Sequence, residues 1–113
     1  MLQGRENRKQ VGFWASSKEK AAAERLPWPG DHVHLFWDEA ERQRIIAFLK
    51  RGDSVAQYRG WSTCRLCGIH NGSQDLGDEM FVWPQGYAHY VDAHHVKPPQ
   101  EFLDWVLRDG LAP

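Results

Sequence analysis

Two cysteines and a pair of histidines carry the most distinctive chemistry of this chain. Cys64 and Cys67 stand three positions apart, with Gly68 directly after them, and His89 and His94 follow. Two thiolates at this spacing can hold one metal ion from a tight turn, and two histidines separated by three to five residues can reach one ion from a helix. The pattern predicts one structural zinc ion held by Cys64, Cys67, His89 and His94.

Two further histidines are alternatives for the fourth ligand. His95 follows His94 directly, and His70 lies three residues after Cys67. At about 100° per residue, His89 and His94 differ in direction by about 140° on an ideal helix, and His89 and His95 by about 120° in the opposite sense. Either residue reaches the metal only if the last helical turn is tighter or wider than the ideal. We expect His94 in preference to His95.

Composition places this motif in a small cytoplasmic protein. The 113 residues are 42% apolar and include six Trp, which suffices for one thin core that a bound metal would stabilise. No run approaches the ~18 consecutive apolar residues of a membrane span, and the first residues lack the apolar stretch of a secretory signal. Two cysteines this close cannot staple a fold by disulfide, so thiolate ligands in a reducing compartment are expected.

Charge is distributed unevenly along the chain. Residues 1–30 carry six Lys and Arg against three Glu, residues 31–60 carry five charges of each sign, and residues 61–113 carry three basic against seven acidic side chains. A zinc module that reads duplex DNA gathers basic side chains beside its helix to meet phosphates, whereas this metal half is acidic. Only the basic first segment is suited to nucleic acid.

The segments before the cysteines predict two helices. Residues 16–25 form a short helix that begins at serine and stops at residues 26–30. Asp38 can cap a stronger helix, with Glu41 at the capping-box position and Gly52 past its end. Spacing on this helix predicts a core-facing stripe. The stripe comprises Ile45, Ile46, Phe48 and Leu49.

A short β-hairpin is expected around the cysteines. Residues 55–64 contain β-favouring Tyr, Trp and Thr and lead into the metal turn. Gly68 suits that turn, because a positive φ lets amide N–H groups point at the sulfurs. The polar residues 71–75 predict a turn, and residues 80–83 predict a returning strand.

The histidines are expected on a helix. Pro84 suits its first turn, residues 87–95 continue it, and residues 96–99 end it. A last helix begins near Pro99 and terminates at residues 109–110. Its buried side chains are predicted to be Phe102, Leu103, Val106 and Leu107. The fold class is therefore α+β, with a short hairpin at a zinc knuckle, a His-bearing helix, and packing helices on either side.

The chain divides into two parts by composition. Residues 1–30 are predicted to be a basic, partly flexible N-terminal segment with a short helix. Residues 31–113 are predicted to form a single zinc-binding domain, in which the zinc module occupies about residues 58–97.

Residues 58–97 resemble zinc fingers of the two-Cys two-His kind. In the DNA-reading members about a dozen residues separate the second Cys from the first His, and the helix start projects base-reading side chains. Here twenty-one residues lie between Cys67 and His89, and residues 84–86, Pro-Gln-Gly, occupy that start. The resemblance implies a finger-like C-x2-C and H-x4-H zinc site without base reading.

Two other resemblances concern the same region. Cys64-x2-Cys67-Gly with residues 92–98, Asp-Ala-His-His-Val-Lys-Pro, resembles the opening half of HNH endonucleases, in which a His of this step is the general base beside a divalent metal. The second half is missing, since no Asn and no His follow His95. Residues 58–68 and 83–91 also resemble phrases in a group of small uncharacterised bacterial proteins.

We expect a binding protein and not an enzyme. Its partner is expected to be another protein, bound as by an adaptor, inhibitor or regulator, because six Trp exceed the needs of this core and indoles are enriched at protein-binding surfaces. One alternative is a nucleic-acid-binding zinc-finger protein that uses residues 1–30. A second is a degenerate HNH-like metal-dependent nuclease or hydrolase. No membrane partner is expected.

Overall fold

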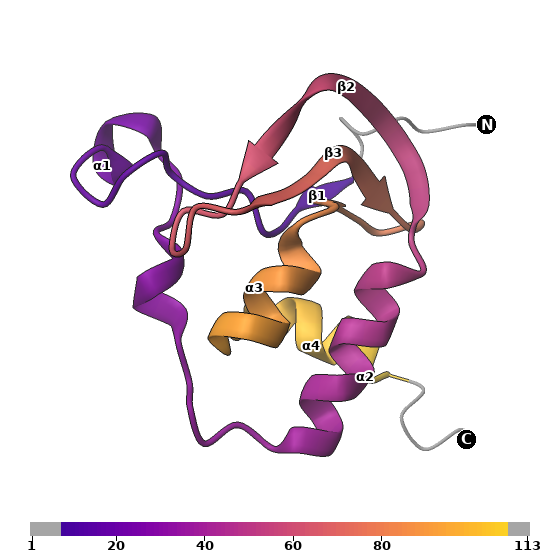
Figure 1. Ribbon diagram of the computed structural model, residues 1–113. Coiled ribbons are helices and arrows are strands. Elements are labelled where there is room, and N and C mark those ends of the chain that lie inside the picture. The colour runs from indigo at the N-terminus through magenta and orange to yellow at the C-terminus, as the bar shows by residue number, and fades with distance from the viewer. Residues whose placement is uncertain (1–7, 109–113) are drawn as a thin grey trace.

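The computed structural model describes residues 8–108, in which a four-stranded mixed sheet lies against helices (Figure 1). The elements in chain order are β1 (Lys9–Gln10), α1 (Ala21–Glu24), the 3-10 helix η2 (Pro29–His32), α2 (Glu39–Lys50), β2 (Asp53–Thr63), β3 (His70–Gly77), β4 (Phe81–Pro84), α3 (Tyr87–His94) and α4 (Gln100–Val106). Helices α2, α3 and α4 gather on one side, and β2 arches over the other. The predicted α+β class is confirmed.

The sheet has the strand order β1-β4-β3-β2. Strand β1 runs parallel to β4, and the other neighbours are antiparallel. Strands β2 and β3 form a hairpin from Asp53 opposite Gly77 to Thr63 opposite His70, so that the C-x2-C turn is the hairpin tip. The predicted hairpin at the cysteines is therefore present.

Two local predictions in this sheet were wrong. Residues 71–75 lie within β3 and do not form a turn, because β2 pairs along this segment and β4 joins it from Asp75 onward. Asp75 is buried in this strand, and its carboxylate accepts a hydrogen bond from the Tyr58 hydroxyl at 2.6 Å. Pro84 lies opposite Asp75 at the end of β4 and not in the first turn of α3, which begins after Gly86.

Helix α2 follows the predicted capping pattern. The Asp38 carboxylate accepts a hydrogen bond from the Glu41 backbone N–H at 2.8 Å, and Ile45, Ile46 and Leu49 are buried. The Glu41 carboxylate accepts from the Trp37 indole N–H at 2.9 Å. The first turn of α2 is thus bonded to the side chain of Trp37, the residue just before the Asp38 cap.

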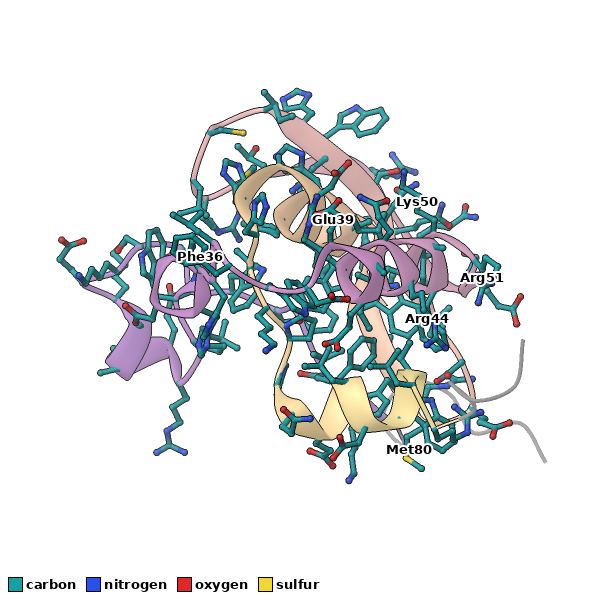
Figure 2. All side chains as sticks on the ribbon, turned by 90° about the horizontal axis from the view of Figure 1, so that it is seen from below. Phe36, Glu39, Arg44, Lys50, Arg51 and Met80 are labelled. Carbon is teal, nitrogen blue, oxygen red and sulfur yellow. The ribbon has the colours of Figure 1, made fainter. Side chains whose placement is uncertain are left out.

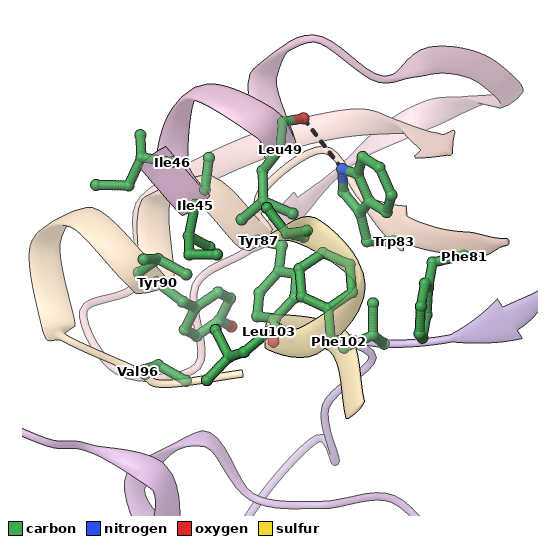
Figure 3. Packing of buried hydrophobic residues seen from close by; sticks show 14 of the residues in the cluster. Ile45, Ile46, Leu49, Phe81, Trp83, Tyr87, Tyr90, Val96, Phe102 and Leu103 are labelled. Atoms are coloured by element: carbon green, nitrogen blue, oxygen red, sulfur yellow. Dashed lines mark hydrogen bonds between the residues drawn. The ribbon is translucent and has the colours of Figure 1, made fainter. Parts of the chain in front are cut away.

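Three aromatic residues form the centre of the core between sheet and helices (Figure 3). Trp83, Tyr87 and Phe102 are fully buried, and the rings of Phe81 and Phe102 meet edge to face with centroids 4.9 Å apart. The Trp83 indole donates to the Leu49 carbonyl at 3.1 Å, which joins β4 to α2. Full burial of one such side chain contributes roughly 1.5–3 kcal/mol.

The first described residues contribute to this core. Val11, Trp14 and Ala15 are buried beside the sheet edge that β1 forms. The short helix expected over residues 16–25 is reduced to α1, because residues 16–20 form bends and turns, and the left-handed Arg25 ends the helix where the prediction placed its end. Residues 1–7 of the predicted basic segment, and the glycine end expected for α4, lie outside the described residues.

None of the helices in residues 8–108 has the length and apolar character needed to cross a bilayer.

Candidate metal centre

Four side chains with metal-binding atoms gather between the hairpin tip and α3. They are Cys64 and Cys67 from the turn and His89 and His94 from the helix, and their ligand atoms all lie within 4.8 Å of one another. The Cys67 Sγ lies 3.3 Å from the His89 Nε2, and the Cys64 Sγ lies 3.5 Å from the His94 Nε2. The group could hold one metal ion.

These separations fit a tetrahedral site. Zinc bonds of about 2.3 Å to sulfur and about 2.0–2.1 Å to nitrogen place the two ligand atoms about 3.5 Å apart. Each Sγ–Nε2 distance also suits a hydrogen bond in the metal-free protein, so one pair alone would not indicate a metal. Convergence of two sulfurs and two ring nitrogens on one point is the feature that indicates an ion.

The turn that carries the cysteines is closed by its own backbone. The Cys64 N–H donates to the Ile69 carbonyl, and the Gly68 N–H donates to the Cys64 carbonyl, each at 2.9 Å. The Leu66 N–H lies 3.4 Å from the Cys64 Sγ, a geometry that stabilises a thiolate. Gly68 has a φ of 81°, as predicted, and a side chain there would be strained.

The end of α3 is wider than an ideal helix. His95 is left-handed with a φ of 54°, and its N–H reaches the Tyr90 carbonyl five residues back instead of four. Such an i to i−5 bond widens the turn and reduces the rotation between successive side chains. His94 is thereby brought toward His89, and their ring centroids lie 5.1 Å apart.

A buried tyrosine holds the turn against α3 without any metal. The Tyr90 hydroxyl accepts a hydrogen bond from the Arg65 backbone N–H at 2.7 Å. The Arg65 guanidinium donates to the carbonyls of Thr63 at 2.7 Å and Ala15 at 3.2 Å. Burial raises the pKa of Tyr90 to about 12, which keeps its hydroxyl protonated. The two halves of the site are therefore positioned in advance.

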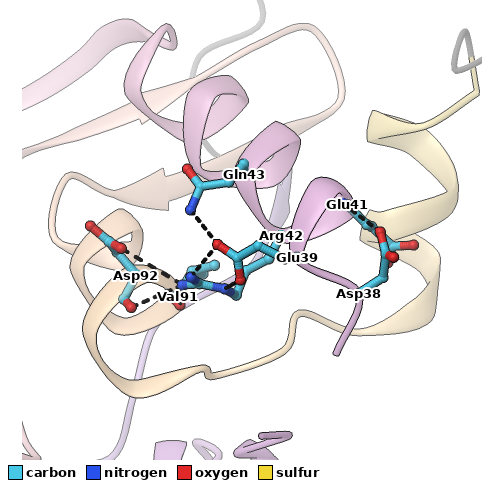
Figure 4. A network of polar contacts seen from close by, with 7 residues as sticks. All are labelled: Asp38, Glu39, Glu41, Arg42, Gln43, Val91 and Asp92. Atoms are coloured by element: carbon cyan, nitrogen blue, oxygen red, sulfur yellow. Dashed lines mark hydrogen bonds and ion pairs between the residues drawn. The ribbon is translucent and has the colours of Figure 1, made fainter. Parts of the chain in front are cut away.

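A second network of polar contacts, which comes from α2, fixes the end of α3 (Figure 4). Arg42, which is buried on α2, donates to the carbonyls of Val91 at 3.1 Å and Asp92 at 2.9 Å and pairs with Glu39. A cation at these carbonyls complements the negative end of the helix. The sequence patterns above do not predict this contact between Arg42 and α3. The signal for it is that Arg42 stands three residues before Ile45, on the same face of the helix as the apolar stripe.

Burial differs among the four side chains. Cys64 is buried and Cys67 is exposed, whereas both histidines are half-buried. Burial, and then the neighbouring charge of His89, lower the pKa of His94. A lowered pKa favours the neutral imidazole, which is the form that binds a metal.

The two alternative histidines lie outside the group of ligand atoms. His70 belongs to β3, and its ring stacks on Trp61 with centroids 6.1 Å apart and planes 6° from parallel. His95 ends α3, and the polypeptide there pairs back with the loop before α2, since its carbonyl accepts from the His34 N–H at 2.9 Å. Among the predicted ligands, the structure brings together Cys64, Cys67, His89 and His94.

No family model, curated protein or solved structure matches this chain. The likenesses to zinc fingers and to HNH endonucleases therefore rest on the residues that carry them.

Proposed function

We propose that this chain is a small binding protein whose single zinc ion has a structural role. The observation that supports this most strongly is the convergence of two Cys and two His on one point. Soft thiolates together with imidazoles select zinc among the common divalent metals. Four protein ligands also fill a tetrahedral shell, whereas a catalytic zinc keeps one position for water or substrate.

The proposed ion would join two parts of the chain that are distant in sequence. The hairpin tip supplies the thiolates, and α3 supplies the imidazoles. Strand β2 lies at the sheet edge and is mostly exposed, so apolar burial holds this hairpin less firmly than it holds the centre of the domain. Metal binding to such a tip contributes directly to the free energy of folding.

Exposed apolar side chains support a protein partner for this proposed binding role. On the hairpin, Trp61 is 64% exposed and Ile69 is 52% exposed. In the loop before α2, where Figure 2 labels Phe36, the Phe36 side chain is fully exposed, and Leu35, its neighbour in sequence, is 68% exposed. Exposed aromatic and aliphatic side chains of this kind are typical of the anchors of protein interfaces.

The enzyme alternative has less support. An HNH-like reaction would use a histidine of the His94-His95 step as a general base beside an accessible metal. His94 is one of the four converging side chains, and His95 lies outside their group. With all four positions filled by protein atoms, we propose no hydrolytic step at this centre.

The structural role is tested by the metal content of the purified full-length protein. Native mass spectrometry should find one zinc per chain, and a chelator should cause the protein to lose both zinc and its cooperative thermal transition. Retention of the full transition after complete zinc removal would contradict the structural role.

The binding role needs a separate test. Wild type and Trp61→Ser, each carrying a photo-crosslinker at position 69, should be compared in the native host, with Arg44→Ser on α2 as the control substitution. We expect one crosslinked protein that persists after nuclease treatment and in Arg44→Ser but disappears in Trp61→Ser. Loss of the crosslink after nuclease treatment would show that the partner is a nucleic acid, and this would contradict the proposed protein partner.

A further inference from the structure

The two thiol groups of the candidate metal centre differ in their access to solvent. Cys64 is 2% exposed, whereas Cys67, on the same turn, is exposed. Their sulfur atoms lie within 4.8 Å of each other, and the sequence contains no other cysteine. A molecule from solvent can therefore reach the Cys67 sulfur, and the Cys64 sulfur lies close enough to react with the product.

An exposed and a buried thiol at this separation suit reversible oxidation. A thiol that binds zinc is deprotonated, and an accessible thiolate reacts with peroxides to give a sulfenic acid. A second thiolate nearby can convert the sulfenic acid to a disulfide before it is oxidised further. The bond requires the two sulfurs to come within about 2.05 Å. The exposed side chain of Cys67 can rotate toward Cys64 without displacing the core.

The contacts around the turn suit a change that can be reversed. The Arg65 N–H donates to the Tyr90 hydroxyl at 2.7 Å, and the Gly68 N–H donates to the Cys64 carbonyl at 2.9 Å. Neither hydrogen bond uses a sulfur atom or a metal. These contacts therefore favour the return of the turn to its place against α3 once the sulfurs are reduced.

The same turn separates two side chains of the proposed protein-binding surface. Trp61 stands three residues before Cys64, and Ile69 stands two residues after Cys67. Both side chains are more than half exposed. Loss of the metal removes the ligand bonds that join the hairpin tip to α3. A change at the sulfurs therefore alters the order of the backbone that presents Trp61 and Ile69.

We propose, on the basis of the structural zinc and the binding role proposed above, that Cys67 and Cys64 form a peroxide-sensitive site that releases zinc and loosens the hairpin tip. The Cys67 sulfur attacks a peroxide oxygen: an S–O bond forms, the O–O bond breaks and hydroxide leaves. The Cys64 sulfur then attacks the Cys67 sulfur: an S–S bond forms, the S–O bond breaks and a second hydroxide leaves.

Electrons and protons balance in this reaction. The two sulfurs lose two electrons in total, the peroxide gains two, and two protons from solvent convert both hydroxides to water. The zinc ion keeps its charge and loses both sulfur ligands. The two imidazoles of His89 and His94 then remain, and two ligands hold zinc far more weakly than four.

The test treats the zinc-loaded full chain with an equimolar amount of hydrogen peroxide. Native mass spectrometry gives the zinc content beforehand, and a colorimetric chelator then follows zinc release. We expect the zinc to be released, the peptide with Cys64 and Cys67 to lose two hydrogens in mass, and dithiothreitol to restore zinc binding. A chain without zinc before oxidation would contradict the proposed structural zinc. A loaded chain that keeps its zinc, or forms sulfinic acid without a disulfide, would overturn the peroxide-sensitive site alone.

Matched variants separate the two thiols from a general sensitivity of the protein to peroxide. Cys67→His keeps four side chains that can bind zinc but cannot form the disulfide. Its zinc release should be slower by roughly tenfold or more, because the remaining Cys64 sulfur is buried, and dithiothreitol should not reverse it. Met80→Leu removes a sulfur outside the turn and should release zinc as wild type does. Release from Cys67→His at the wild-type rate would overturn the assignment.

Amide exchange of the oxidised wild-type chain tests the effect on the hairpin. Exchange over residues 60–72 should be faster than in the reduced, zinc-loaded chain by roughly tenfold or more, with little change in β4. Reduction and zinc should restore the slow exchange. Equal exchange in the oxidised and reduced chains would overturn the proposed regulation of the binding surface.

Discussion

An inner strand of the sheet and the hairpin at its edge are stabilised in different ways. Strand β4 is almost entirely buried and contacts the aromatic core, whereas β2 is exposed along most of its length. Trp83 and Phe102 hold the first region through apolar packing. The hairpin tip has instead one buried tyrosine contact and four converging metal-binding side chains. A small domain can thus use a metal where its hydrophobic core does not reach.

Loss of the buried Cys64 thiol group should have the largest effect on the hairpin tip. Structural zinc in finger peptides contributes roughly 10–16 kcal/mol of apparent binding free energy at pH 7. We expect Cys64→Ser to abolish zinc binding and to speed amide exchange around residues 60–72 roughly a hundredfold, with less change in β4. Exchange mass spectrometry can measure this. Uniform acceleration across the domain would remove the distinction between the two regions.

Truncation of a side chain in the aromatic core should instead destabilise the core and leave the hairpin tip able to bind zinc. Phe102 is fully buried and contacts Phe48, Phe81 and Trp83. Phe102→Ala should lower the free energy of unfolding by about 3–5 kcal/mol through the cavity it creates. Denaturant unfolding gives this value, and zinc stoichiometry should remain one per chain under native conditions. Loss of zinc from the folded variant would show that the two regions depend on each other.

The adjacent histidines provide a matched pair for the metal site. His94→Ala should weaken zinc binding by more than the roughly 10–100-fold that loss of a supporting partner costs. His95→Ala removes a side chain outside the group and should leave the affinity near that of wild type. Competition with a colorimetric chelator measures both. Equal losses, or a larger loss at His95, would assign the fourth ligand differently.

The smallest predicted effect concerns the contact that positions the hairpin tip. Tyr90→Phe leaves the Arg65 N–H without its acceptor and should cost about 0.5–1.5 kcal/mol, the range for an ordinary hydrogen bond, because this bond is only partly buried. Tyr87→Phe is the control, because that hydroxyl has no hydrogen-bond partner among residues 8–108 and its removal should not destabilise the protein. Thermal unfolding compares the two. A larger loss for Tyr87→Phe would contradict both assignments.

Local signals predicted the elements that local interactions determine. The Asp38 cap and the spacing of Ile45 and Leu49 were enough to predict α2, and C-x2-C with Gly68 predicted the metal turn. Residues 71–75 were misassigned because their polar composition favours a turn. Pairing with β2, which is not a local property, makes this segment a strand instead.

The choice of fourth ligand shows a similar limit. Ideal helix geometry left His94 and His95 nearly equivalent, and the left-handed end of α3 decides which side chain faces His89. Arg42 contributes to that end from a separate helix. Spacing therefore predicted the kind of site, whereas tertiary contacts select the residue.

X-ray absorption at the zinc edge of the purified protein measures the ligand shell of the proposed ion itself. We expect a first shell of two sulfurs at about 2.3 Å and two nitrogens at about 2.0–2.1 Å, with no water oxygen. A shell with one or no sulfur, or with an oxygen in the fourth position, would contradict a closed structural site made from both thiolates and both histidines.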